Sequence, residues 1–109
     1  MYKMFYNNYL NDIYQEILYS NYSEEYLESF NEQNFIEVYY LLKEYGFYYI
    51  EDIIINYIEL FGIDVKYVRL ALENMKNNLT KDFIKIIGSD MTLVNNIIKL
   101  ALSYSNNEV

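Results

Sequence analysis

The residues of this sequence that could do chemistry are carboxylates and tyrosines, because the chain contains no histidine and no cysteine. The usual ligands of zinc, iron–sulfur and haem sites are therefore missing, and so is the commonest general acid–base residue. Paired carboxylates could support hydrolysis or bind a hard cation, and a tyrosine could act as a nucleophile on DNA. The sixteen acidic residues and fifteen tyrosines are thus the side chains whose positions matter.

No arrangement of these residues matches a catalytic or metal-binding motif. The sequence has no P-loop, no dinucleotide-binding glycine pattern, no nucleophile elbow and no calcium-binding loop. A tyrosine nucleophile would need several cationic groups around the phosphate, and Arg69 is the only arginine. We therefore expect no enzyme, and no catalytic residue, metal or cofactor.

The charged residues are distributed unevenly along the chain. Residues 1–60 contain eleven acids and two bases, a net charge of −9, whereas residues 61–109 contain five acids and six bases, a net charge of +1. Thirteen of the fifteen tyrosines also fall in the first sixty residues. Because the overall charge is −8 and the later bases are mixed with acids, we expect no direct binding of nucleic acid.

The elements that must position these side chains are helices. The apolar residues follow a helical spacing throughout, which predicts an all-α fold. We expect a compact bundle of about six to seven short helices, forming a single domain over residues 1–105 with a frayed tail at residues 106–109. No apolar run is long enough to span a membrane, so we expect a cytoplasmic protein without membrane contact.

The first expected helix covers roughly residues 2–20. Its expected inner face carries five residues: Tyr6, Tyr9, Leu10, Ile13 and Ile17. Ser23, followed by two glutamates, predicts the N-cap of a short second helix that ends near Asn31. A third helix is expected to stop at Gly46, a residue type typical of the position after a helix end.

A continuous fourth helix is expected from Ile50 to Phe61, with Gly62 ending it. Three further helices are expected to begin at capping residues Asp64, Thr80 and Asp90, and Gly88 is expected to end the sixth helix. Their expected inward residues are Val68, Ala71, Leu72, Met75, Phe83, Ile86, Ile87, Val94, Ile97, Ile98 and Ala101.

Eight carboxylates form the acidic part of a candidate partner-binding surface: Asp12, Glu16, Glu24, Glu25, Glu28, Glu32, Glu37 and Glu44. Glu24, Glu28 and Glu32 follow an i, i+4, i+8 spacing, which stacks carboxylates roughly 6 Å apart if the helix is continuous. Like charges at this spacing cost about a few tenths of a kcal/mol each. A surface that tolerates such repulsion suits a cationic partner.

Five tyrosines are further candidates for a protein interface: Tyr39, Tyr40, Tyr45, Tyr48 and Tyr49. The chain has more tyrosines than one small core can bury with every hydroxyl satisfied, and tyrosine is favoured at interfaces. An AT-rich genome would also enrich tyrosine, asparagine and isoleucine. The same bias should give many lysines, yet only seven are present, which points to selection for negative charge.

Two non-catalytic functions fit these patterns. The first is an acidic inhibitor or decoy, whose carboxylates replace phosphates on a basic, nucleic-acid-binding surface of a partner protein. In length, charge and helix content the chain resembles anti-CRISPR and other anti-defence proteins of phages and mobile elements, which would place it in the host cytoplasm. It matches no family motif. The second is a helical adaptor or homo-oligomer, such as a homodimer, that uses exposed tyrosines.

Overall fold

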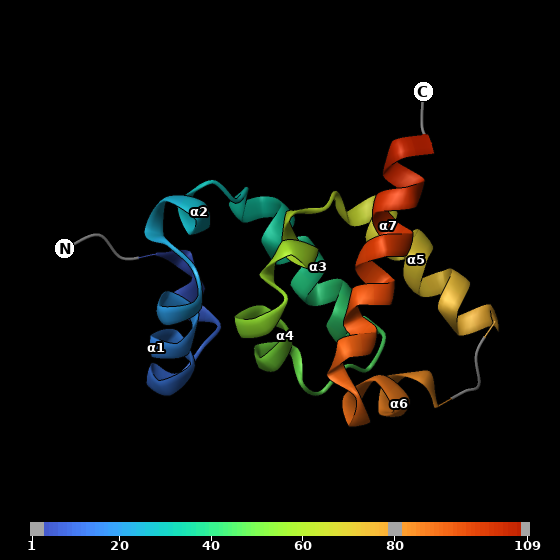
Figure 1. The fold of residues 1–109 in the computed structure, drawn as a ribbon, viewed down its shortest axis with the longest axis horizontal. Helices are drawn as coiled ribbons and strands as arrows, with labels where there is room; N and C mark the ends of the chain where they lie inside the picture. Colours follow the sequence, from blue (N-terminus) through green and yellow to red (C-terminus); the bar gives the residue numbers. More distant parts are fainter. Residues whose placement is uncertain (1–3, 79–81, 108–109) are drawn as a thin grey trace.

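Residues 4–78 and 82–107, which the computed structural model describes, contain only helices and the turns between them (Figure 1). In chain order they form η1 (Phe5–Asn8), α1 (Asp12–Asn21), α2 (Glu24–Glu28), α3 (Glu32–Glu44), α4 (Ile50–Asn56), η2 (Ile58–Gly62), α5 (Val65–Asn78), α6 (Phe83–Ser89), η3 (Met91–Leu93) and α7 (Val94–Asn107), where η denotes a 3-10 helix. The all-α bundle of short helices predicted from the sequence is confirmed.

Two helix pairs and a central helix organise the bundle (Figure 1). Helix α5 packs along α7, and α6 connects them at one end. On the opposite side α1 packs against α4. Helix α3 runs between these pairs and contacts α4, η2 and α5, so it links the acidic N-terminal part of the chain to the C-terminal hairpin.

The core is centred on the ring of Phe35 in α3, which is fully buried. Its centroid lies 5.2 Å from that of Tyr6 in η1 and 4.9 Å from that of Phe61 in η2. Edge-to-face and tilted aromatic pairs at these distances are favourable beyond the area that they bury. Phe35 therefore packs both η1 and η2 against α3.

The prediction of one continuous first helix is wrong, because the segment forms two elements, η1 and α1. Asn11 interrupts it and caps α1, because its side chain accepts a hydrogen bond from the backbone N–H of Tyr14 at 2.9 Å. The break changes the phase of the helix, so that Leu18 faces the core. Ile13 and Ile17 are then 69% and 37% exposed, although the apolar spacing placed both on the inner face.

The expected fourth helix is also divided. Helix α4 ends at Asn56, and Tyr57 leaves the helical region with φ −139° and ψ 45° before η2 begins. The inward stripe survives the break, since Ile53, Ile54 and Phe61 are fully buried. Ile53, Ile54 and Ile55 are β-branched, which lowers the helix propensity of the segment before the break. Little helix stability is therefore lost when α4 ends there.

The predicted end of the third helix at Gly46 is confirmed by its hydrogen bonds. Gly46 has φ +92°, and its N–H donates to the carbonyl of Lys43 at 3.0 Å. The N–H of Phe47 donates to the carbonyl of Leu42 at 3.0 Å, which completes a Schellman motif at the end of α3. The αL conformation explains why a glycine is needed there.

Capping by Ser23 and Asp64 is confirmed, because each side chain accepts a backbone N–H two or three residues later. Asp90 caps η3 by accepting the N–H of Thr92, so that α7 itself begins only at Val94. Thr80 lies outside the described residues. Helix α7 continues to Asn107, two residues into the expected tail, and residues 108–109 are not described.

All eleven inward residues expected after Asp64 are buried except Ile86, which is 43% exposed.

One side chain fixes the junction between η2 and α5. The Asn34 amide nitrogen donates to the carbonyls of Phe61 at 3.0 Å and Ile63 at 2.7 Å. Its Oδ1 accepts a hydrogen bond from the backbone N–H of Val65 at 3.0 Å. Helix ends leave such backbone groups without partners, so Asn34 satisfies the end of one helix and the start of the next while tying both to α3.

We predict that Asn34→Ala lowers the free energy of unfolding by about 2–4 kcal/mol, because three partly buried backbone groups lose their partner. Urea denaturation followed by circular dichroism measures the change. The control is Asn56→Ala, since the Asn56 amide donates only to the Asp52 carbonyl of its own helix at 3.1 Å; we expect a change below about 0.5 kcal/mol. Equal stability of the two variants would contradict this role of Asn34.

Candidate protein-binding surface

The eight candidate carboxylates all belong to exposed residues. They lie on three consecutive helices, with Asp12 and Glu16 on α1, Glu24, Glu25 and Glu28 on α2, and Glu32, Glu37 and Glu44 on α3. The helices thus present to solvent the negative charge that the sequence concentrates in its first half.

The expected ladder of Glu24, Glu28 and Glu32 does not form. Helix α2 ends at Glu28, and Asn31 caps α3 by accepting a hydrogen bond from the backbone N–H of Asn34 at 2.8 Å. Glu32 therefore begins a different helix, and only Glu24 and Glu28 share one. The ladder required a continuous helix, and the asparagine cap prevents it.

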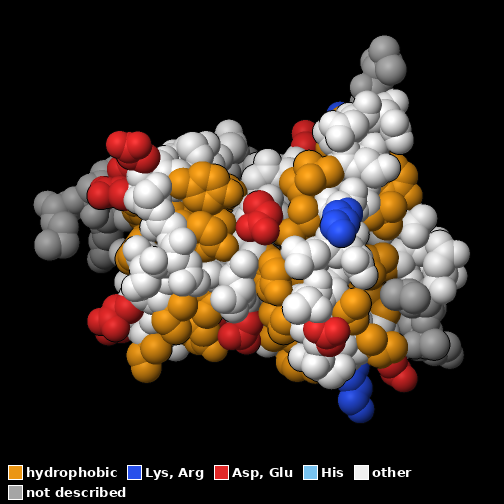
Figure 2. All heavy atoms as spheres, in the orientation of Figure 1, with side chains coloured by type: hydrophobic (Ala, Val, Ile, Leu, Met, Phe, Trp, Pro, Cys, Tyr) orange, Lys and Arg blue, Asp and Glu red, His pale blue; other side chains and the backbone are white. Residues whose placement is uncertain are grey.

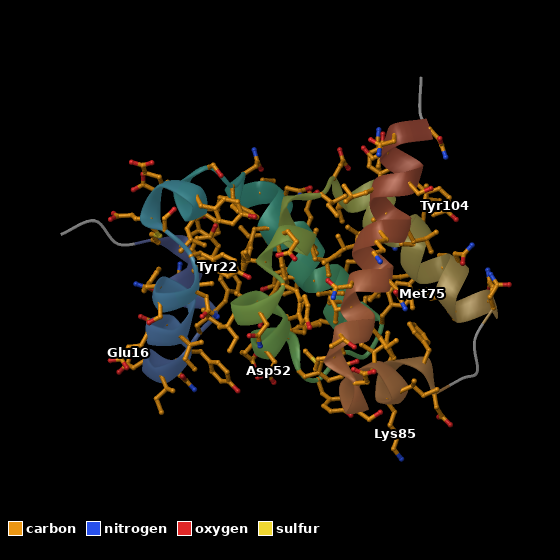
Figure 3. All side chains as sticks on the ribbon, in the orientation of Figure 1. Glu16, Tyr22, Asp52, Met75, Lys85 and Tyr104 are labelled. Carbon is orange, nitrogen blue, oxygen red and sulfur yellow. The ribbon has the colours of Figure 1, made fainter. Side chains whose placement is uncertain are left out.

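The acidic side chains are dispersed. On the face shown in Figure 2 they are separated by polar and apolar surface. Glu16 on α1 and Asp52 on α4 project from separate helices (Figure 3). Within residues 4–78 and 82–107, no group of three or more acidic side chains converges as metal ligands would. The charge is a broad field over the N-terminal part of the molecule.

Two basic side chains are engaged within this region. The Nη1 of Arg69 on α5 lies 3.1 Å from the Oε2 of Glu44, and both side chains are more than half exposed. Exposed ion pairs of this kind contribute about 0–1 kcal/mol. The Nζ of Lys43 lies over the ring of Tyr39, 5.1 Å from its centroid. These contacts leave a large excess of negative charge on α1 to α3.

The five candidate tyrosines divide between surface and core. Tyr40 and Tyr48 are 57% and 70% exposed, whereas Tyr39 and Tyr49 are 8% and 7% exposed. The expectation that Tyr39 and Tyr49 belong to an exposed interface is therefore wrong, because both side chains are buried. Tyr49 is buried because its ring packs on Gly88. Gly88 was expected to end the sixth helix, but it lies within the last turn of α6. A Cβ at Gly88 would lie 2.8 Å from Tyr49 Cε1.

Several tyrosine hydroxyls join one element to another. The hydroxyl of Tyr6 donates to the carbonyl of Leu27 at 2.7 Å, and that of Tyr49 donates to the carbonyl of Ile84. The hydroxyl of Tyr14 on α1 donates to Asp52 on α4 at 3.2 Å. Many tyrosines therefore act as ties between helices, which accounts for much of their number without an interface.

Tyr45 is the remaining candidate, and it is partly buried at the end of α3. Its hydroxyl donates to the Oε1 of Glu73 on α5. Burial, together with the hydrogen bond and negative charge of Glu73, raises the pKa of Tyr45 to about 12. The side chain is thus another tie between helices, and its proton is held firmly in the folded state.

We predict that Tyr45 makes the fold sensitive to alkali. An unfolded tyrosine ionises near pKa 10, so the stability from the raised pKa is complete below about pH 10 and is lost as the pH rises through about 12. In Tyr45→Phe, urea denaturation should show a shallower fall of stability over this range than in the native chain. Tyr40→Phe, on an exposed ring, is the control. Parallel curves for Tyr45→Phe and the native chain would contradict the prediction.

An acidic and apolar face on α1 was missed by sequence reasoning. Ile13 and Ile17 lie one turn apart on the exposed side of the helix, and Asp12 and Glu16 precede them in the same spacing. Helix α1 contacts α4 through its other side. The signal for this face was Asn11, a strong N-cap residue that sets a new helical phase.

In comparisons with family models, curated proteins and solved structures, no significant similarity to this chain is found. Within the described ranges, no helix is long and apolar enough to cross a membrane.

Proposed function

We propose that this chain is a non-catalytic inhibitor that binds a basic, nucleic-acid-binding partner protein. The observation that carries the proposal is the set of eight exposed carboxylates dispersed over α1, α2 and α3, where the one described lysine, Lys43, lies over an aromatic ring. These carboxylates repel one another in the free protein. A basic partner surface relieves this repulsion.

A dispersed acidic field suits a nucleic-acid channel better than a small pocket. Proteins that bind nucleic acids place lysines and arginines along the path of the phosphates, and these contacts dominate affinity. Carboxylates spread over three helices can meet several such cations at once. A nucleic-acid-binding enzyme of a host defence system, such as a CRISPR or restriction enzyme, is the class of partner that we propose.

The face of α1 adds apolar contact to this electrostatic attraction. Stable interfaces have an apolar centre and a polar rim, and a few central side chains provide most of the affinity. Ile13 and Ile17 are suited to the centre, and Asp12 and Glu16 to the rim. The exposed isoleucines thus offer a contact that charge alone does not supply.

The proposal is tested by capturing the partner from a lysate of a low-GC bacterium. We expect a nucleic-acid-binding protein that is released by high salt and displaced by added DNA or RNA. With the purified partner, Glu16→Gln combined with Glu28→Gln should weaken binding about fivefold, since exposed charges contribute about 0.5 kcal/mol each.

The matched control is Asn95→Lys combined with Asn96→Lys, which changes the net charge by the same amount on exposed positions of α7. It should leave binding nearly unchanged, because screening confines exposed charges to about 8 Å at physiological salt. Binding that survives high salt, or equal effects of the two double variants, would contradict the proposal.

A homo-oligomer is the second candidate, favoured by the exposure of Ile13, Tyr40 and Tyr48. Under the inhibitor proposal, Ile13→Ala weakens partner binding by about tenfold without lowering stability, and Leu70→Ala, at a residue 48% exposed on α5, has little effect. Light scattering over a range of concentrations separates the two functions. A native dimer that Ile13→Ala converts to a monomer would favour the oligomer.

A further inference from the structure

A groove with a volume of about 780 Å³ lies where α2, α3, η2, α5 and α7 approach one another. Its walls come from the end of α2, the first turns of α3, the end of η2, the junction before α5 and the last part of α7. The volume is within the range of sites that bind ligands. Asn34, which lines the groove, holds three of these elements together.

One wall of the groove is aromatic. The rings of Tyr26 and Phe30 meet edge to face, with centroids 5.1 Å apart and an interplanar angle of 87°. Phe30 lies directly on Gly62, where an added Cβ would be 3.0 Å from Phe30 Cε2. Tyr26 is 40% exposed, and Leu102 from α7 is 44% exposed. The groove therefore presents apolar side chains to solvent.

The groove is also acidic. Glu37, Glu59 and Asp64 line the groove, and no lysine or arginine is among its described lining residues. Asp64 already accepts the backbone N–H of Lys66 at 3.0 Å. Burial raises the pKa of the Tyr26 hydroxyl, and the charge of Glu59 raises it further. Glu59 and the exposed ring of Tyr26 line the same groove, so it offers a carboxylate and an aromatic surface to one ligand.

We infer that this groove binds an arginine side chain from an exposed segment of a basic partner protein. A guanidinium group is planar, so it can stack on the ring of Tyr26 while its N–H groups donate in pairs to the carboxylate of Glu59. A lysine ammonium offers the same charge without the planar surface. The groove therefore selects arginine over lysine.

The inference rests on the proposed function, because it assigns one recognition point within the acidic surface. Glu37 belongs to both, being an exposed carboxylate of α3 and a lining residue of the groove. The carboxylates on α1 and α2 attract a basic partner, and the groove receives one of its arginines. Charge complementarity and the exposed aromatic wall together identify the occupant.

The test is an NMR titration of the native protein with a short glycine peptide that carries two arginines. Peptides of the same length with two lysines or two citrullines are compared with it. We expect saturable shifts at Tyr26, Phe30 and Leu102, binding of the arginine peptide about fivefold tighter than the lysine peptide, and no binding of the citrulline peptide. Equal binding of arginine and lysine, shifts elsewhere, or no saturable shifts would overturn the inference.

Variants of single residues locate the site. Glu59→Gln should weaken the arginine peptide about fivefold because the charged acceptor is lost, and Tyr26→Leu should remove the preference for arginine over lysine. Glu51→Gln is the matched control, since it makes the same charge change at a partly buried position of α4, outside both the groove and the eight candidate carboxylates. The spectrum away from the groove reports whether each variant is folded. Equal effects of Glu59→Gln and Glu51→Gln would overturn the inference.

The two proposals fail in different ways. If the Glu16 and Glu28 variant weakens partner capture while Glu59→Gln does not, and no peptide binds, the groove inference is wrong and the inhibitor proposal stands. If the arginine peptide binds at the groove but partner capture is insensitive to salt, the arginine site stands. Its assignment to a nucleic-acid-binding partner is then wrong.

Discussion

The side-chain amide of Asn34 is the contact on which the arrangement of this bundle depends, because it joins α3 to the end of η2 and the start of α5. A chain divided into short helices has many helix ends, and each end leaves backbone groups without partners. Asparagines supply those partners repeatedly: Asn11 and Asn31 cap α1 and α3, and Asn21 donates to the carbonyl of Ile55 at 2.7 Å. Abundant asparagine is thus part of how this fold is built.

Tyrosine, like asparagine, joins one helix to another in this fold. Its abundance is therefore weaker evidence for a binding function. The rings of Tyr6 and Tyr49 fill the core while their hydroxyls bond carbonyls of other elements. A residue that is both large and polar can close contacts between short helices that have few apolar residues to share. The number of tyrosines therefore says little about an interface, and the evidence that remains comes from the exposed rings of Tyr19, Tyr26, Tyr40 and Tyr48.

Sequence reasoning succeeded where a long periodic stripe coincided with a cap, as in α5 after Asp64, whose four expected inward residues are all buried. It failed where one side chain divided a periodic stretch. Apolar spacing alone does not reveal that Asn11 starts a new helix, so Ile13 and Ile17 were assigned to the wrong side. The acidic ladder through Glu32 failed for the same reason at Asn31. The groove was beyond prediction, because its walls come from segments that only the packing of α3, η2 and α7 brings together.

The dispersal of the carboxylates bears on how specific binding could arise. Exposed charges act over about 8 Å at physiological salt and fix no single orientation, so a broad acidic field chiefly raises the rate of encounter with a basic surface. Residence time depends on side chains that are desolvated at the centre of an interface. In the proposed complex, the side chains desolvated at the centre are the isoleucines of α1 and the aromatic wall of the groove. These two contacts lie on different elements. Two such contacts with a carboxylate beside each would set the orientation that the charge alone leaves open.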